Sequence, residues 1–221
     1  MEVARTKDGI YVSQRKYTLD LLQETGMLGC KAANTPIEQI KGREDESPPA
    51  DKDRYQSLVG KLIYLSHTRP DIGFAVSLAS RYMSNPTESN MKMANRILQY
   101  LKGTPGRGLH FKRNSNRDIE VYTNSDWAGC STDRKSTTVY CSFVWGNLVT
   151  WRSKKQFVVV RSSAEAKFRA MALGICGGMW LKSMLDEIKI HVNHSVRLLY
   201  DNKAAISIAK NPVQHDRTKH V

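Results

Sequence analysis

Val121-Tyr-Thr-Asn-Ser-Asp-Trp-Ala-Gly129 is the stretch on which the fold depends, because a short β-rich run ends there in a polar turn. Two later stretches also carry an acid where a regular element meets a loop. Arg161-Ser-Ser-Ala-Glu-Ala166 opens a long predicted helix with Glu165 on its first turn. Leu198-Leu-Tyr-Asp-Asn-Lys-Ala-Ala205 ends a strand at Asp201. Side chains at the ends of two strands and at the start of a helix can meet at one edge of a sheet.

Asn124, Glu165 and Asp201 are therefore the candidate catalytic and metal-binding residues. Hydrolysis of a phosphodiester by two divalent ions about 4 Å apart needs converging oxygen ligands, so that one ion activates water and the other stabilises the leaving oxygen. Hard oxygen ligands without histidine or thiolate favour Mg²⁺ or Mn²⁺. Asn124 can contribute only a neutral carbonyl ligand, because an amide carries no negative charge.

Each of the three residues also has a purely local explanation. Ser162-x-x-Glu165 is a capping-box pattern, in which the carboxylate reaches back to the cap amide. Asp201 and Asn202 lie between a strand and a short predicted helix, where either residue commonly caps. Asn124 fits ordinary turn chemistry. Taken one at a time, the residues leave both interpretations open.

The charge of the chain predicts a polyanionic partner. The 221 residues carry a formal net charge of +13 with a pI near 9.7. Nucleic acid is the leading partner on this ground, and a merely basic protein of the ribosomal kind is the alternative. Five basic residues near the candidate site would contact a phosphate backbone, unless they form only a solvated face. They are Arg152, Lys154, Lys155, Arg161 and Arg169.

Cysteine usage and hydropathy exclude several other classes. The four cysteines are scattered without a C-x-x-C pair, which argues against a zinc site and favours thiols of a reducing compartment. No apolar run approaches the roughly 20 residues that span a bilayer, and no secretory pattern opens the chain. We expect an intracellular protein that is neither secreted nor bound to a membrane.

The first half of the chain predicts a hairpin and a set of helices. The hairpin turns on Asp8-Gly9, and a helix follows from about Arg15 to Glu24. After a polar linker, three helices with apolar periodicity follow, with Ile63 and Phe74 among their expected core-facing residues. The expected segments are residues 1–36 (hairpin and helix), 37–53 (linker), 54–104 (helical subdomain), 105–117 (linker) and 118–221 (a domain rich in strands).

Beyond Asp118 the period changes from helical to β-rich runs. The expected order is three strands, a long helix from Ser163 to about Glu187, a strand from Val196 to Tyr200 and a second helix from Lys203 to Lys210. Three meandering strands and a helix that crosses to a fourth predict an α/β fold with a mixed sheet, in which helices pack on three antiparallel strands and one parallel strand. Within the long helix, the stripe that contains Glu165, Phe168, Ala172 and Cys176 is expected to face the sheet.

Several motifs in this order resemble the ribonuclease H domain of Ty1/copia-type retrotransposon Pol polyproteins. The resemblance covers nearly all of residues 118–221. It rests on Tyr122-Thr-Asn-Ser-Asp-Trp-Ala-Gly129, Asp133-Arg-Lys-Ser-Thr137, Thr150-Trp-Arg-Ser-Lys-Lys-Gln156, Arg161-Ser-Ser-Ala-Glu-Ala166, Tyr200-Asp-Asn-Lys-Ala-Ala-Ile206 and Asn211-Pro-Val-Gln-His-Asp-Arg-Thr-Lys-His220. Upstream, a second group of motifs is similar to the end of the reverse transcriptase and its connection: Ser13-Gln-Arg-Lys-Tyr17, Leu58-Val-Gly-Lys-Leu-Ile-Tyr-Leu65, Thr68-Arg-Pro-Asp-Ile72 and Leu98-Gln-Tyr-Leu-Lys-Gly-Thr-Pro105.

The resemblance implies a ribonuclease H-like fold and cleavage of the RNA strand of an RNA/DNA hybrid with magnesium. Asn124 occupies the position of the family's first metal-binding aspartate, and Glu165 and Asp201 match the second and third acids. The family's last acid would lie beyond Val221. The implied partners are the hybrid and the rest of a Pol polyprotein, in a cytoplasmic retroelement particle or in the nucleus.

Some residues depart from the family pattern and indicate decay. Gly177-Gly178 interrupts the long helix, where each glycine costs roughly 1 kcal/mol relative to alanine. Lys167 stands where the family commonly has an acid. Asp126 replaces Asn124 poorly, since two residues along a strand move a side chain by about 6 to 7 Å. The alternative to an impaired nuclease is therefore a catalytically inactive nucleic-acid-binding remnant of a decayed element.

Overall fold

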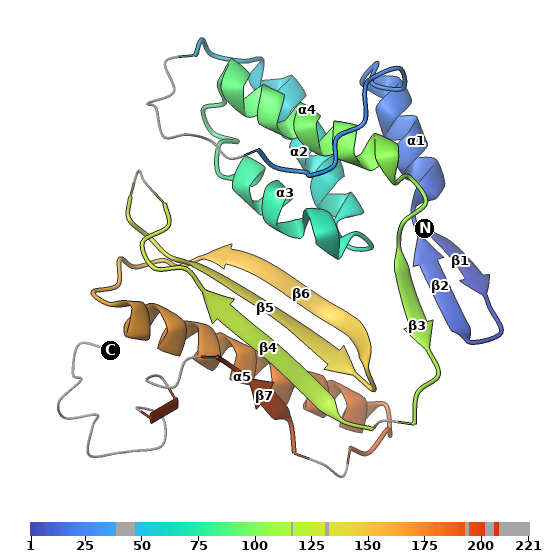
Figure 1. Cartoon of the computed structure of the whole chain (residues 1–221), viewed down its shortest axis with the longest axis vertical. Helices are drawn as coiled ribbons and strands as arrows, with labels where there is room; N and C mark the ends of the chain where they lie inside the picture. The colour runs from blue at the N-terminus through green and yellow to red at the C-terminus, as the bar shows by residue number, and fades with distance from the viewer. Residues whose placement is uncertain (39–46, 116, 131–132, 193–194, 202–205, 208–221) are drawn as a thin grey trace. The chain divides into compact units, whose positions relative to one another are not determined.

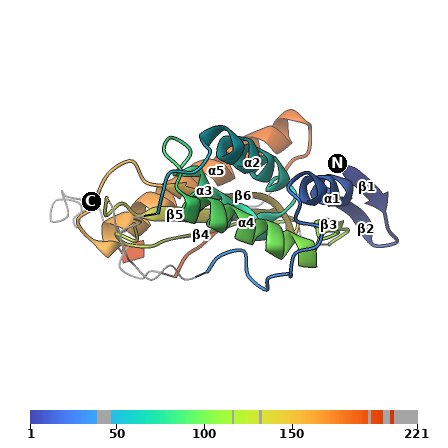
Figure 2. The ribbon, with the colours of Figure 1, turned by 90° about the horizontal axis from the view of Figure 1, so that it is seen from above.

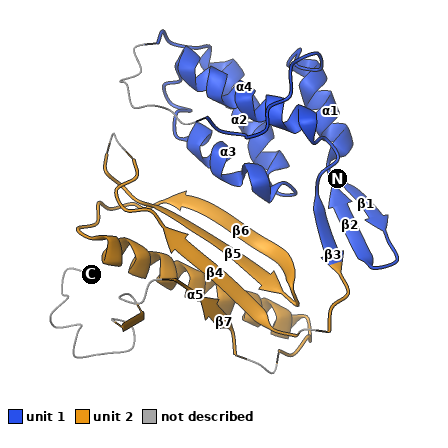
Figure 3. Cartoon of the chain, viewed as in Figure 1, with its two compact units in different colours: residues 1–111 blue, residues 112–221 orange. Residues whose placement is uncertain are grey.

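The structure is a computed structural model that describes residues 1–38, 47–115, 117–130, 133–192, 195–201 and 206–207. The chain forms two compact units, Met1–Phe111 and Lys112–Val221, and each is described by itself (Figure 3). The division between the units falls inside the expected linker 105–117. No helix in the described part of the chain is both long enough and apolar enough to cross a bilayer.

Unit 1 contains a three-stranded sheet in the order β1-β2-β3 (Figure 1). β1 (Glu2–Arg5) and β2 (Gly9–Ser13) form the antiparallel hairpin that the sequence predicts, with Arg5 opposite Ile10. β3 (Leu109–Lys112) pairs with β2, although the sequence analysis assigns this segment to a linker. β3 follows the last helix of the unit in the sequence, about 100 residues after β2, so no local pattern indicates that the two strands pair.

The helices of unit 1 pack side by side (Figure 2). They are α1 (Arg15–Glu24), α2 (Lys52–Leu65), the 3₁₀ turn η1 (Pro70–Ile72), α3 (Gly73–Ser80) and α4 (Glu88–Gly103). The apolar periodicity predicts their existence and most of the buried side chains of α2 and α4. Together they enclose the main core of the unit.

Two core predictions in unit 1 are wrong. Ile63 is 39% exposed and Phe74 is 47% exposed. Ile63 follows the fully buried Leu62 and lies just outside the apolar stripe of α2. The prediction for Phe74 fails because the turn before α3 is a 3₁₀ helix with three residues per turn. A spacing of 3.6 residues per turn counted from Pro70 therefore assigns Phe74 to the wrong face of the helix.

A buried charged group connects η1 to the end of α4. Arg69 is 1% exposed, and its guanidinium donates to both carboxylate oxygens of Asp71 and, at 2.8 Å, to the carbonyl oxygen of Thr104. The hydroxyl of Tyr100 donates to Asp71 at 2.8 Å. Burial alone would raise the pKa of Asp71, but the hydrogen bonds from Arg69 and Tyr100, together with the positive charges of Arg69 and Arg107, outweigh it and lower that pKa below its ordinary value.

Unit 2 is a mixed α/β unit whose four strands lie in the order β6-β5-β4-β7. β4 (Ile119–Ser125), β5 (Thr137–Val144) and β6 (Asn147–Lys155) form an antiparallel meander. The long helix α5 (Ser163–Glu187) then crosses one face of the sheet, and β7 (Arg197–Leu199) returns parallel to β4 (Figure 1). The mixed sheet is therefore confirmed, whereas the helix expected at 203–210 lies almost wholly outside the described residues.

The face of α5 that contacts the sheet differs from the prediction. Glu165 is buried, but Ala172 and Cys176 are exposed. The sheet side carries small residues, among them Ala170 and Gly174, which allow the helix to approach closely. The predicted stripe follows helical spacing from Glu165, whereas the buried stripe runs through Ala166, Ala170, Gly174 and Gly178, where small volume allows close contact.

Gly178 is required by this close approach. A Cβ atom on Gly178 would lie 2.8 Å from Cγ1 of Val196 and 3.1 Å from Cγ2 of Val121. A Cβ atom on Gly177 would meet the ring of Tyr140 only at 3.5 Å, an ordinary contact. Gly178 therefore has a packing role, because an added methyl group would force Val196 to shift, whereas the interpretation of Gly177 as decay stays a prediction.

Candidate functional site

The first strand of the site, β4, presents alternating side chains to the two faces of the sheet. Thr123 is buried under α5, and its hydroxyl donates to the carbonyl oxygen of Ala170 at 2.9 Å. Asn124 therefore points to the opposite face, where it is exposed. Its Oδ1 accepts a hydrogen bond from the backbone N–H of Ser125 at 2.8 Å.

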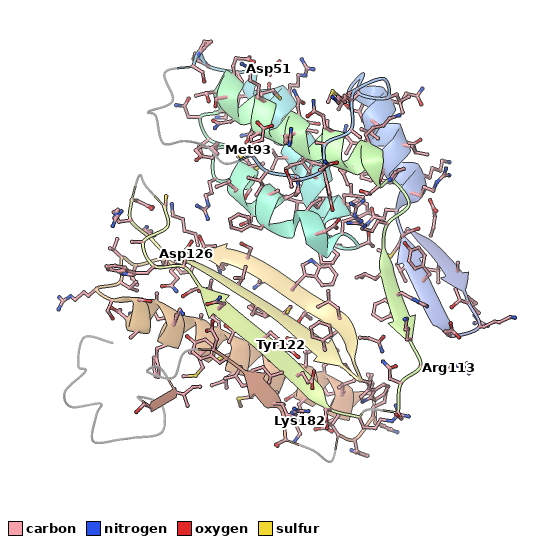
Figure 4. All side chains as sticks on the ribbon, viewed as in Figure 1. Asp51, Met93, Arg113, Tyr122, Asp126 and Lys182 are labelled. Atoms are coloured by element: carbon pink, nitrogen blue, oxygen red, sulfur yellow. The ribbon has the colours of Figure 1, made fainter. Side chains whose placement is uncertain are left out.

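Asp126 follows the end of β4 and is used in the turn (Figure 4). Its Oδ1 accepts a hydrogen bond from the backbone N–H of Thr137, and its own N–H donates to the carbonyl oxygen of Thr137 at 3.2 Å. The carboxylate also packs against Gly129. Asp126 thus closes the connection between β4 and β5, and its carboxylate is used by this turn.

Glu165 lies on the first turn of α5 with only 4% of its surface exposed. Oε1 accepts a hydrogen bond from Nε of Arg169 at 3.1 Å, and Oε2 accepts one from the backbone N–H of Arg161 at 2.9 Å. Ser162 caps the helix, because its Oγ accepts from the N–H of Glu165 at 3.1 Å. The predicted capping box is thus half right, since the carboxylate reaches Arg161 rather than the cap residue itself.

Asp201 lies two residues beyond β7. The parallel register pairs Val121 with Leu198 and Tyr122 with Leu199, and its continuation by two residues would set Asn124 beside Asp201. The carboxylate of Asp201 is largely exposed and lies 3.8 Å from Nζ of Lys167 on α5.

These contacts bring the three candidates to the same end of the unit but do not form a metal centre. The register of β4 and β7 relates Asn124 to Asp201. Asp201 in turn contacts Lys167 on α5, and Lys167 lies two residues after Glu165. Among the described residues, no group of three or more His, Cys, Asp or Glu side chains is placed to hold a metal ion. Two carboxylates, each beside its own cation, and one neutral amide do not fit a divalent ion.

The five predicted phosphate contacts separate into two kinds. Arg152, Lys154 and Arg161 are exposed. Arg152 and Lys154 lie opposite Tyr140 and the buried Thr138, so both side chains are on the α5 side of β6, an edge strand of the sheet. The other two residues are held by acids: Arg169 by Glu165, and Lys155 by Asp133 at 2.8 Å.

The Lys155 contact is a small polar cluster between the end of β6 and the loop that joins β4 to β5. Nζ of Lys155 also lies 3.1 Å from Sγ of Cys130. The hydrogen bond from Lys155 holds the pKa of Asp133 well below its usual range, with a further contribution from Cys130. Burial works to lower the pKa of Lys155, but the hydrogen bonds to Asp133 and Cys130 and the charges of both groups together outweigh it and raise that pKa. Lys155 is therefore committed to an internal contact.

Sequence reasoning missed Gln156, which fixes the start of α5 on the sheet. The side chain is buried, and Nε2 donates at 3.0 Å to both Oγ1 of Thr138 and the carbonyl oxygen of Ala166. Its backbone N–H donates to Ser136 at 2.8 Å. The only sequence signal is a neutral amide at the end of a basic strand, which by itself does not indicate burial.

Unit 2 is thus an α/β unit with a basic edge strand and with Glu165 and Asp201 near one end of its mixed sheet. The chain is 38% identical over 224 residues to the Retrovirus-related Pol polyprotein from transposon RE2 of Arabidopsis thaliana, and 38% identical over 223 residues to the corresponding polyprotein from transposon RE1. All of this chain is covered in both comparisons, but it spans only 15% of the length of each polyprotein.

A shorter relative is matched over most of its length. It is the Uncharacterized mitochondrial protein AtMg00810 of Arabidopsis thaliana, which is 36% identical over 181 residues, covering 81% of this chain and 75% of the relative. No protein-family model matches the chain, and no solved structure matches it. Over its whole length the chain is thus homologous to one segment of retrotransposon Pol polyproteins.

Proposed function

We propose that unit 2 is a ribonuclease H-type domain of a Pol sequence that binds RNA/DNA hybrids and whose cleavage chemistry is impaired. The observation that carries the proposal is the parallel pairing of β7 beside β4, with α5 as the crossover. This topology accounts for acids at the end of a strand and at the start of a helix converging on one end of the sheet.

Impairment follows from the charges around the candidate residues. Asn124 is neutral, the carboxylate of Glu165 is paired with Arg169, and that of Asp201 faces Lys167. The two acids and the two cations leave no net negative charge to attract a divalent ion. Two-metal hydrolysis depends on such charge, so we derive no metal-dependent step for the chain as it stands.

Binding follows from the exposed cations that remain. Arg152 and Lys154 are two residues apart on an edge strand, a separation of about 6 to 7 Å along it. Arg161 is also exposed, before the start of α5. Together with the net charge of +13, these residues support contact with successive phosphates of a nucleic-acid backbone.

The second candidate function is a weak ribonuclease H that uses Mg²⁺ or Mn²⁺. It is favoured by the register that would set Asn124 beside Asp201, because the amide carbonyl can still contribute one neutral oxygen. Under either function the partners are the hybrid and the rest of a Pol polyprotein, and the location is a cytoplasmic retroelement particle or the nucleus.

The deciding experiment measures cleavage and binding of the same labelled RNA/DNA hybrid. The purified chain, Asn124→Asp, and Asn124→Asp combined with Glu165→Gln are compared with Mg²⁺ or Mn²⁺ and with EDTA. We expect the unaltered chain to bind hybrid with little cleavage, Asn124→Asp to raise metal-dependent cleavage, and Glu165→Gln to abolish that gain. Failure of the unaltered chain to bind hybrid would overturn the proposed function, and efficient cleavage by it would favour the second candidate.

A further inference from the structure

The loop between β6 and α5 exposes three consecutive large apolar side chains. Phe157 is 81% exposed, Val158 43% and Val159 56%. Trp127, in the turn after β4, is 51% exposed. A protein surface rarely exposes several large apolar side chains together unless they form a binding site for a partner or ligand.

The exposed loop is anchored at both ends. Gln156, before it, is buried and hydrogen-bonded to Thr138 and Ala166. Val160, after it, is 3% exposed, and its carbonyl oxygen accepts a hydrogen bond from Nε1 of Trp127 at 3.4 Å. The protein thus fixes the backbone on either side of Phe157 while it leaves the ring in solvent.

The charges around this ring indicate what it contacts. Nζ of Lys154 lies 4.8 Å from the centre of the Phe157 ring, in a cation–π contact. Arg152 lies two residues earlier on the same side of β6, and Arg161 follows the loop and is exposed. An aromatic ring flanked by cations is the arrangement that holds single-stranded nucleic acid, since the cations track phosphates while a base stacks on the ring.

We propose that Phe157 is a stacking platform for an unpaired base of a nucleic-acid strand whose backbone follows β6 along Arg152 and Lys154. Trp127 supports the loop through its hydrogen bond to Val160. The inference rests on the proposed function, and it specifies that the domain also engages unpaired nucleotides, such as those adjoining a hybrid. Stacking has little sequence preference, because every base presents a π-face.

The test compares two oligomers that differ only in their bases. One is a fluorescently labelled twelve-residue oligothymidylate, and the other is an abasic strand of the same length and charge. Affinities are measured for the unaltered chain, Phe157→Ala, Phe157→Leu and a matched control, Phe74→Ala, whose ring is 47% exposed on α3 of unit 1. Phe157→Leu keeps an apolar side chain but removes the π-face.

We expect Phe157→Ala and Phe157→Leu to weaken oligothymidylate binding by roughly 5- to 150-fold, the range for loss of one stacked base. Binding of the abasic strand should be unchanged, and the slope of log affinity against log salt should also be unchanged, because no charge is lost. Phe74→Ala should bind both strands like the unaltered chain. Because Phe157 is so exposed, both of its variants should retain the thermal unfolding curve of the parent.

An equal loss of affinity for both strands, or no loss for either, would overturn the stacking role. Retention of full affinity by Phe157→Leu would likewise overturn it in favour of a simple apolar contact. If hybrid binding persists while the Phe157 variants behave like the parent, only this inference fails. If oligothymidylate binds through Phe157 but hybrid does not bind, the proposed function fails and the platform remains.

Discussion

The ammonium of Lys167 lies 3.8 Å from the carboxylate of Asp201, and this pair joins α5 to the residues after β7. A fixed cation thus stands beside one of the acids that the sequence analysis predicts to bind a metal. The other acid, Glu165, forms a salt bridge with Arg169, which lies four residues further along α5. The protein supplies its own positive charges at this end of the sheet.

Replacement of Lys167 by glutamine in an Asn124→Asp background should strengthen binding of Mn²⁺ by at least about tenfold, because the local charge becomes more negative by two. Free Mn²⁺ can be measured directly by electron paramagnetic resonance during a titration.

The matched control is Lys182→Gln in the same background, since Lys182 lies further along the same helix (Figure 4). Equal Mn²⁺ affinity of the two double variants would show that Lys167 does not govern the site.

Gly177 and Gly178 should respond oppositely to alanine. Both substitutions gain about 1 kcal/mol in helix propensity, so Gly177→Ala should raise the unfolding temperature. Gly178→Ala should be less stable than Gly177→Ala by about 1 to 3 kcal/mol, because the added methyl group meets Val196 and Val121. Chemical denaturation followed by circular dichroism measures the difference. Equal stability of the two variants would refute the close-packing role of Gly178.

Asp71→Asn should destabilise unit 1 by about 3 kcal/mol at pH 7, because it leaves the buried guanidinium of Arg69 without its counter-charge. The folded-state pKa of Asp71 lies below its unfolded value, so its contribution is present above the unfolded pKa and is lost as the pH falls through the folded pKa. The stability difference between the variant and the parent should therefore narrow below about pH 4. Urea denaturation at several pH values checks this, and a difference that stayed constant down to pH 2 would contradict it.

Arg152→Ala and Lys154→Ala should each weaken hybrid binding and reduce the slope of log affinity against log salt by about 1. Lys155→Ala is the internal control, because its ammonium is committed to Asp133. Its slope should stay close to that of the parent. Fluorescence anisotropy at several salt concentrations provides the values, and an equal reduction in all three variants would show that the Lys155 contact is not maintained.

Much of the secondary structure could be predicted from the sequence. The hairpin, α1 and α5 follow local rules, such as the Asp8-Gly9 turn and the Ser162 cap, which act over a few residues. The faces were harder to predict. Phe74, Ala172 and Cys176 are exposed because helix phase and close packing depend on neighbours that lie elsewhere in the chain.

Some features of the candidate site could be predicted from the sequence, and others could not. The sequence indicated Glu165 on the first turn of α5 and acids near strand ends, because cap and strand-end positions are set locally. It could not indicate that Asp126 is used by the β4–β5 turn or that Lys155 is paired with Asp133. Those contacts join residues brought together by strand pairing.

Composition, periodicity and ordered motifs are properties of the chain alone, and they are enough to indicate a basic α/β protein homologous to a segment of retrotransposon Pol polyproteins. Which charges are neutralised and which remain exposed depends on the tertiary fold. Pairing of Lys167 with Asp201 and exposure of Phe157 beside Lys154 both depend on distances across the fold. Coulombic and stacking contacts act over a few ångströms in space, whatever the separation in sequence.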